Sequence, residues 1–441
     1  MTLAIVLQFL VVLAAIWMGA RSSGIGLGLW GAVGLLVLVA GFGINPTSPP
    51  IDVMLIILAV IMAASVMEAA GGIDFLVRIA ERIIRANPKY VTIVAPLTTW
   101  TFTFVAGTGH IVYPLLPVIY ETAHRSGIRP ERPMAVATIA SQQAITASPV
   151  AAATAAMIGL FAEKGMTQWG LPQILMVCVP ATLTGVVAAA IVSMFVGKDL
   201  KDDPEYQARL AAGQIPAPQA DTSRTPLKPG ARLSAFIFLA GVALVVLFGF
   251  FPSLRQLPGA KSPLAMPIVI EILMMSVAAI MLLLTKVPVD EVPKTATLRA
   301  GVVAVIGIFG LAWLGDSFIA ANKDVIVPAI GDWAKVAPWT FAFGLFLASV
   351  LLYSQAATTR ALMPLGIALG IPPQFLIAMF PSVNGYFFIP TYGSLIAAIN
   401  FDLSGTTKIG KYVLNHSFMI PGLVATSVAV FTGLAIARVI F

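Results

Sequence analysis

The chain has 441 residues, of which 59% are hydrophobic and only 10% are charged. Soluble globular proteins carry about 25% charged residues, so this composition excludes a soluble domain and predicts an all-α, polytopic membrane protein in a lipid bilayer. The net charge of +7 does not indicate a nucleic-acid partner, because the basic residues lie in loops between apolar segments, as membrane topology requires.

Several apolar segments are long enough to cross a bilayer as helices. The first has no basic region before it and no cleavage motif, so we interpret it as a retained span rather than a signal peptide. The predicted spans are residues 3–20, 24–43, 51–70, 171–197, 232–252, 264–285, 297–319 and 412–439.

Two further regions, 89–163 and 338–400, are too long for one crossing and are interrupted by Gly, Pro and polar residues, as in the stretch VAGTGHIVYPLLP at 105–117. Irregular backbone at membrane depth persists only where it is buried in protein or lines a cavity. We therefore predict that each region forms a re-entrant hairpin followed by a broken transmembrane helix. The hairpins are expected at about 89–124 and 338–370, and the broken helices at about 133–163 and 373–400.

A polar, proline-bearing segment at 198–231 divides the chain into halves, 1–197 and 232–441, and is predicted to be a cytoplasmic linker. The halves repeat the same order of elements: three spans, an irregular region and a last span. An offset of 250 residues supports a repeat. It pairs Pro88 with Pro338, Ala106 with Ala356, Thr108 with Thr358, Pro114 with Pro364, and His110 with Arg360.

The distribution of basic residues predicts the orientation. With both termini in the periplasm and each hairpin entering and leaving on one side, 19 of the 26 Lys and Arg residues lie in the cytoplasm, and the opposite orientation reverses this bias. Each half then crosses the membrane an odd number of times. The second half is therefore expected to be an inverted repeat of the first, as in many secondary transporters.

The hairpin tips are the candidate substrate site, because helix N-termini, backbone N–H groups and hydroxyls near the bilayer midplane suit an anion. The alternative is that the glycines and threonines only permit close helix packing, or that the hydroxyls bond their own helix. The candidate residues are Thr108, Gly109 and His110 in the first tip, Ser354, Gln355, Thr358, Thr359 and Arg360 in the second, and Gln143, Thr146, Ser148, Asn384, Thr391 and Tyr392 in the broken helices.

Arg360 is singled out because a cation at membrane depth costs about 2.5–3.5 kcal/mol even on the lenient insertion scale, and its fork matches a carboxylate. The alternatives are an Arg that reaches the outer surface or pairs with an acid. His110 could contact a second carboxylate, carry a proton, or pack as a neutral side chain. Glu271 lies within an apolar span and is the other candidate for proton coupling, whereas Asp74 and Asp316 are expected to cap helices.

Other chemistries leave no pattern in the sequence. Cys178 is the single cysteine, which excludes an intramolecular disulfide, and the three histidines and the acids form no metal-binding motif, so we expect neither metal nor cofactor. No nucleophile–base pair or zinc-protease motif indicates an enzyme.

Seven stretches resemble the bacterial anaerobic C4-dicarboxylate transporter family, Dcu, with its DcuA-like and DcuB-like branches, nearly from end to end. They are NPKYVTIVAPLTTWTFTFVAGTGHIVYPLLPVIYE, GIRPERPMA, ITASPV, AWLGD, LLYSQAATTRALMP, FIPTYGSLIAAI and SGTTKIGKYVLNHSFMIPG. The first two are more similar to the branch associated with fumarate–succinate exchange, and LLYSQAATTRALMP to the branch associated with aspartate uptake.

The resemblance implies transport of fumarate, succinate, malate and aspartate across the bacterial inner membrane, including exchange of one for another. It also implies a homodimer in which a transport domain moves against a scaffold domain as an elevator. The alternative function is a proton- or sodium-coupled transporter of another organic anion such as citrate. The scarcity of acids within the membrane argues against a cation antiporter, and the broken, inverted halves argue against a channel.

Overall fold

The structure, a computed structural model, describes residues 3–22, 24–215, 226–260, 262–352 and 354–441. Within these ranges the chain is helical, and its only strand-like pairing is a single bridge between Ile409 and His416. The helices before the linker are α1 (Leu3–Ser22), α2 (Gly26–Phe42), α3 (Ile51–Ala69), α4 (Gly72–Ala86), α5 (Val91–Ala106), α6 (Val112–Arg125), α7 (Glu131–Gln143), α8 (Ala152–Glu163) and α9 (Leu171–Ser193).

The described residues of the predicted linker, 198–231, include a 3-10 turn at Leu200–Asp202 and the helix α10 (Pro204–Ala211), and residues 216–225 lie outside the described ranges. The remaining helices are α11 (Ala231–Phe250), α12 (Met266–Thr285), α13 (Ala296–Gly307), α14 (Trp313–Val336), α15 (Phe341–Leu352), α16 (Gln355–Ala368), α17 (Pro373–Met379), α18 (Gly393–Phe401) and α19 (Met419–Ile440). A π-helical turn at Ile308–Ala312 joins α13 directly to α14.

Six helical segments in the described ranges are long and apolar enough to cross a membrane: Ile51–Ala69, Leu171–Ser193, Ala231–Phe250, Met266–Thr285, Ala296–Val325 and Met419–Ile440. The stretches Leu3–Gly19 and Gly26–Phe42 are apolar helices as well. Large apolar side chains face outward, for example Leu283 at 75% exposure and Phe431 at 68%. Such an outer surface requires lipid rather than water, so the predicted multi-pass helical protein is confirmed.

Both irregular regions are broken helices. In the first half, α5 ends at Ala106 and α6 begins at Val112, and the helical course of α7 is interrupted at 144–151 before α8. In the second half, α15 and α16 form the matching pair, and a 3-10 stretch at Phe380–Phe387 with an irregular segment at 388–392 separates α17 from α18. The bilayer crossings, the inverted repeat and the domain boundaries remain predictions.

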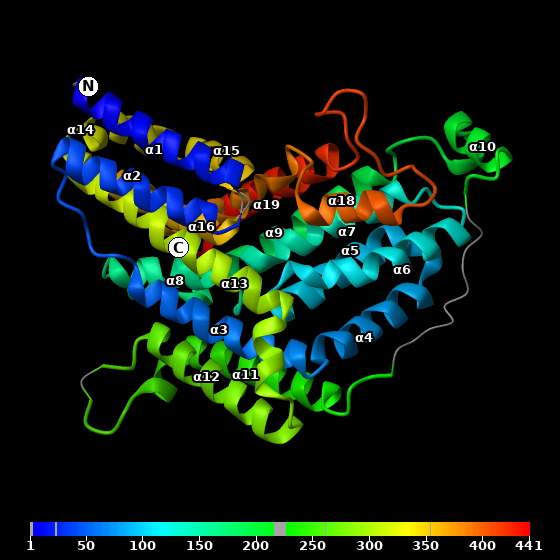
Figure 1. Cartoon of the computed structure of the whole chain (residues 1–441), viewed down its shortest axis with the longest axis horizontal. Coiled ribbons are helices and arrows are strands. Elements are labelled where there is room, and N and C mark those ends of the chain that lie inside the picture. The colour runs from blue at the N-terminus through cyan, green and yellow to red at the C-terminus, as the bar shows by residue number, and fades with distance from the viewer. Residues whose placement is uncertain (1–2, 23, 216–225, 261, 353) are drawn as a thin grey trace.

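Helices distant in sequence pack together around these breaks. α9 lies along α19, α5 along α7, and α3 along α12 and α13, while α16 packs on α8. Figure 1 shows α1, α2, α14 and α15 grouped at the end that carries the N-terminus, whereas α10 lies at the other end of the molecule. The turn between α5 and α6 and the start of α16 line one cavity.

The last span begins later than predicted, at Met419 rather than at residue 412. The preceding loop is held by side chains that compete with helical hydrogen bonding. The carboxylate of Asp402 accepts from the backbone of Ser404 and Thr407 and from the hydroxyls of Ser404 and Thr406, and Ser417 bonds the backbone of Lys408.

Candidate functional site

The first tip is a tight turn that only glycine fits. Gly107 ends α5 in the left-handed region, with φ of 71°, and a Cβ there would lie 2.5 Å from the carbonyl oxygen of Val150. Thr108 is extended, and its hydroxyl accepts a hydrogen bond from the backbone of His110. At Gly109 a Cβ would lie 2.5 Å from Nε2 of Gln142, so the tip rests directly on the broken helix.

The second tip is the N-terminus of α16. Ser354 caps this helix, since its Oγ accepts from the backbone N–H of Ala357 at 3.2 Å. The hydroxyls of Thr358 and Thr359 bond the carbonyls of Ser354 and Gln355, four residues earlier. First-turn amides of a helix have no partner within the helix, so this end suits an anion.

A chain of amide side chains joins the second tip to both broken helices. Nε2 of Gln355 donates to Oε1 of Gln142 at 2.9 Å and to Oδ1 of Asn384 at 3.1 Å. Asn384 in turn donates to Gln143 at 3.3 Å, and Gln143 donates to the hydroxyl of Thr426 on α19 at 2.8 Å. The chain fixes Gln355 and Gln142 at the centre of the molecule.

A cavity of about 390 Å³ lies between the tips. This volume is within the range of small-molecule sites, and its wall is apolar with a few polar groups, as such sites require. Its polar and aromatic lining comprises Thr108, Gly109, His110, Tyr113, Gln142, Arg299, Ser354, Gln355 and Tyr392.

Six of the sequence-predicted site residues therefore meet in one cavity: Thr108, Gly109, His110, Ser354, Gln355 and Tyr392. Gln143 and Asn384 lie behind it in the amide chain. Thr146, Ser148, Thr358, Thr359 and Thr391 are absent from the lining. The hydroxyls of Thr146, Thr358 and Thr359 donate to carbonyls of their own segments, which is the back-bonding alternative for these side chains. The hydroxyl of Ser148 instead accepts from the backbone N–H of Val150.

Arg360 is not brought to this cavity. It lies five residues into α16 and lines a separate cavity of about 700 Å³ with Glu163 and Asp316. Its Nη2 donates to Glu163 at 2.6 Å and to Asp316 at 3.3 Å, and the residue is only 2% exposed. This geometry fits the alternative in which Arg360 pairs with acids of the protein. One of these acids is Asp316, which was expected to cap a helix.

Glu271 lies on α12 and lines neither of these cavities. Of the two candidates for proton coupling, only His110 is therefore in contact with the central cavity. Within the described ranges, no group of His, Cys, Asp and Glu side chains could hold a metal ion.

The sequence interpretation missed Arg299 and Tyr113. Arg299 stands in the first turn of α13, where the sequence shows only a basic residue at the start of a span. Tyr113 lies one turn beyond His110, and its ring stacks on the imidazole with centroids 5.9 Å apart. The position of Tyr113 beside the GTGH tip could have identified it, whereas nothing in the sequence indicated which face of α13 meets the tips.

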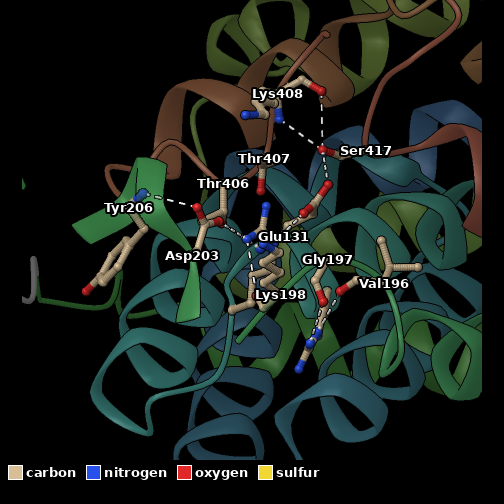
Figure 2. A network of polar contacts seen from close by, with 12 residues as sticks. Glu131, Val196, Gly197, Lys198, Asp203, Tyr206, Thr406, Thr407, Lys408 and Ser417 are labelled. Carbon is tan, nitrogen blue, oxygen red and sulfur yellow. Dashed lines mark hydrogen bonds and ion pairs between the residues drawn. The ribbon is translucent and has the colours of Figure 1, made fainter. Parts of the chain in front are cut away.

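A second polar cluster joins the linker to the ends of α7 and α19 (Figure 2). Arg129 is buried and pairs with Glu131 and with Asp203. Ser417 donates to Glu131 at 2.6 Å, and Asp203 caps α10 by accepting from the backbone of Tyr206. Partial burial favours the neutral acid, but hydrogen bonds from Arg129 and the α10 backbone outweigh it and lower the pKa of Asp203.

Comparison with known proteins identifies the family. The family model described as "Anaerobic c4-dicarboxylate membrane transporter" matches residues 4–441. The chain is 42% identical to the C4-dicarboxylate transporter DcuA of Escherichia coli K12, over 97% of this chain and 98% of the relative. It is 40% identical to DcuA of Wolinella succinogenes, over 99% and 100%, and 40% identical to the anaerobic C4-dicarboxylate transporter DcuB of Escherichia coli O157:H7, over 96% of each.

Two solved transporters share the fold at low identity. MtrF of Neisseria gonorrhoeae, described as an antimetabolite efflux pump, aligns with a TM-score of 0.54 at 16% identity, over 93% of this chain and 85% of that one. YdaH of Alcanivorax borkumensis aligns with a TM-score of 0.57 at 13% identity, over 92% and 87%. The full-length matches show more than a fold: this chain is a membrane transporter, not an enzyme, and belongs to the DcuA/DcuB family of anaerobic C4-dicarboxylate transporters.

Proposed function

We propose that the chain exchanges one C4-dicarboxylate for another across the bacterial inner membrane by alternating access. Fumarate, succinate, malate and aspartate are the substrates that the family resemblance implies. The observation that carries the proposal is the central cavity, in which two hairpin tips from different halves of the chain present a helix N-terminus, amides and hydroxyls. Such neutral donors suit a carboxylate that must bind and leave.

In this proposal Thr108, Gly109, His110, Ser354 and the backbone N–H of Gln355 contact one carboxylate, because the side-chain amide of Gln355 already donates to Gln142 and Asn384. Gln143 and Asn384 hold Gln355 in position through the amide chain. Arg360 acts on the outer side of the site through its ion pairs with Glu163 and Asp316. The elevator movement, the inverted repeat and the homodimer belong to the same proposal and rest on the family resemblance.

Counterflow in proteoliposomes tests the exchange. Vesicles loaded with unlabelled succinate receive labelled fumarate, malate, aspartate or citrate, with and without proton and sodium gradients. We expect internal succinate to accelerate entry of C4-dicarboxylates at least tenfold, independently of either gradient. Uptake of citrate driven by a proton or sodium gradient, with no acceleration by internal succinate, would replace the proposal by the alternative of a coupled transporter. His110 in the cavity is then the first residue to examine for proton coupling.

A further inference from the structure

One face of α13 forms the wall of the central cavity opposite the tips. Arg299, Ala300, Val303, Ala304 and Gly307 line the cavity, and their spacing places them along a single side of the helix. Four of these residues are small or apolar, so their side chains can make only van der Waals contacts with a substrate. Arg299 is the only Lys or Arg among the described residues that line this cavity.

The guanidinium of Arg299 has few partners among the described residues. Its one hydrogen bond is a long one, from Nε to the carbonyl of Thr295 at 3.4 Å, and no carboxylate in the described part of the chain is within ion-pair distance. The acid nearby in the fold, Glu68, is engaged elsewhere. Its two oxygens accept from the backbone of Ala296 at 2.9 Å and of Thr297 at 3.0 Å, so Glu68 holds the start of α13 in place.

We propose that Arg299 binds the second carboxylate of the substrate and thereby makes the site selective for dicarboxylates over monocarboxylates. This inference rests on the proposed function. The first carboxylate meets the N-terminus of α16 and the GTGH tip, which together carry only partial positive charge. When a diacid is bound in this way, its second carboxylate faces α13. There the guanidinium of Arg299 supplies a full positive charge and two N–H donors in one plane.

The discriminating experiment compares succinate with succinamate, in which one carboxylate is replaced by a neutral amide of the same size. Displacement of labelled succinate is measured on detergent-purified wild type, Arg299→Gln and Arg299→Lys. The matched control is Lys294→Gln, which removes an exposed charge five residues earlier that pairs with Glu291. Melting temperatures establish that each variant is folded.

We expect Arg299→Gln to weaken succinate binding roughly ten- to hundredfold, the range for a hydrogen bond to a charged group. Succinamate binding should change less than about threefold, so the preference for the diacid collapses. Arg299→Lys should keep part of that preference, and Lys294→Gln all of it. Equal losses for both ligands, or an unchanged preference in Arg299→Gln, would overturn the inference while leaving the transport function intact. A wild type that binds no C4-dicarboxylate would instead remove the proposed function itself.

Discussion

Arg360 shows how the environment of a residue decides its role. In the sequence it is a lone cation at a polar tip within an apolar region, and a dicarboxylate or an acid of the protein is its candidate partner. In the fold α8 and α14 each bring an acid to it, so its charge is balanced before any substrate arrives. Its Nε and Nη1 still have no hydrogen-bond partner among the described residues. The guanidinium therefore has acid partners at Nη2 and two further nitrogens without a partner among the described residues.

Replacing Arg360 with Met tests this structural role. The change leaves Glu163 and Asp316 without their cation, which should cost about 3 kcal/mol, the low end for breaking a buried pair, because the acids are 24% and 13% exposed. We expect a clear fall in the melting temperature in detergent. The triple variant Arg360→Met, Glu163→Gln, Asp316→Asn should recover most of it, since no charge is then left unpaired.

Lys323→Met is the matched control for that experiment, because Lys323 lines the same cavity and is exposed. It should leave the melting temperature unchanged. Succinate should still raise the melting temperature of the triple variant, because ligand binding stabilises the folded state. If the triple variant is stable but no longer responds to succinate, then Arg360 belongs to the substrate site after all.

The ion pair between Asp203 and Arg129 attaches the linker to the loop after α6, and its strength depends on pH. Because the pKa of Asp203 in the folded protein is below the usual value of about 3.9, its contribution to stability is complete above that value and is lost as the pH falls through the folded pKa. We expect Asp203→Asn to destabilise the protein by about 1.5 kcal/mol at pH 7, since Glu131 still pairs with Arg129. The difference in melting temperature from wild type should shrink only below about pH 4. The exposed neighbour Asp202, changed to Asn, is the control, and a difference that is constant down to pH 3 would contradict the prediction.

At the scale of elements, the helix breaks matter more than the helices. The two tips meet because each is a short, cap-stabilised interruption, with Thr108 bonding the backbone in one and Ser354 in the other. A continuous helix at either place would satisfy its own amides and offer none to a ligand. The site is therefore built from backbone that the sequence prevents from being helical.

Adding a methyl group to the first tip tests that dependence. In Gly107→Ala the new Cβ meets the carbonyl of Val150 in a left-handed conformation, and in Gly109→Ala it meets the amide of Gln142. We expect each change to reduce counterflow at least tenfold, because the tip must shift away from the cavity. Gly344→Ala, in α15, is the control, since nothing lies within 4 Å of its Cβ position. Normal exchange by both tip variants would show that the tip does not contact substrate.

The sequence predicted these breaks well because glycine, proline and polar side chains act locally. Thr108, Gly109, His110, Ser354 and Gln355 were identified in this way and share one cavity. Arg299 was not, because its place in the cavity depends on α13 lying across the cavity from the first tip, which brings together segments nearly 200 residues apart in the chain. For Arg360 the sequence left two alternatives open, a substrate carboxylate or an acid of the protein, because Glu163 and Asp316 are distant in sequence and lie outside its own hairpin.

At the scale of the whole molecule, contacts between loops show that the loops gather at two ends of the molecule. Arg129 pairs with Asp203, and Lys408 pairs with Glu205, so the loop after α6, the linker and the loop before α19 lie together. At the other end, the ring of Trp169 packs against Phe441, which puts the C-terminus beside the loop after α8. The end with the linker gathers loops that are rich in basic residues, so the positive-inside rule predicts that this end faces the cytoplasm.

Cysteine labelling on intact cells tests this orientation. Cys178, which is buried, is first changed to Ala to give a background without thiols. Single cysteines then replace Lys201 in the linker and Ser253 in the turn after α11, both exposed. An impermeant thiol reagent should label the residue-253 site and a cysteine added after Phe441 from outside, because both are predicted to be periplasmic. The residue-201 site should react only after the cells are opened. If all three sites are labelled equally from outside, the linker and the C-terminus lie on one side, the second half crosses an even number of times, and the inverted repeat has to be abandoned.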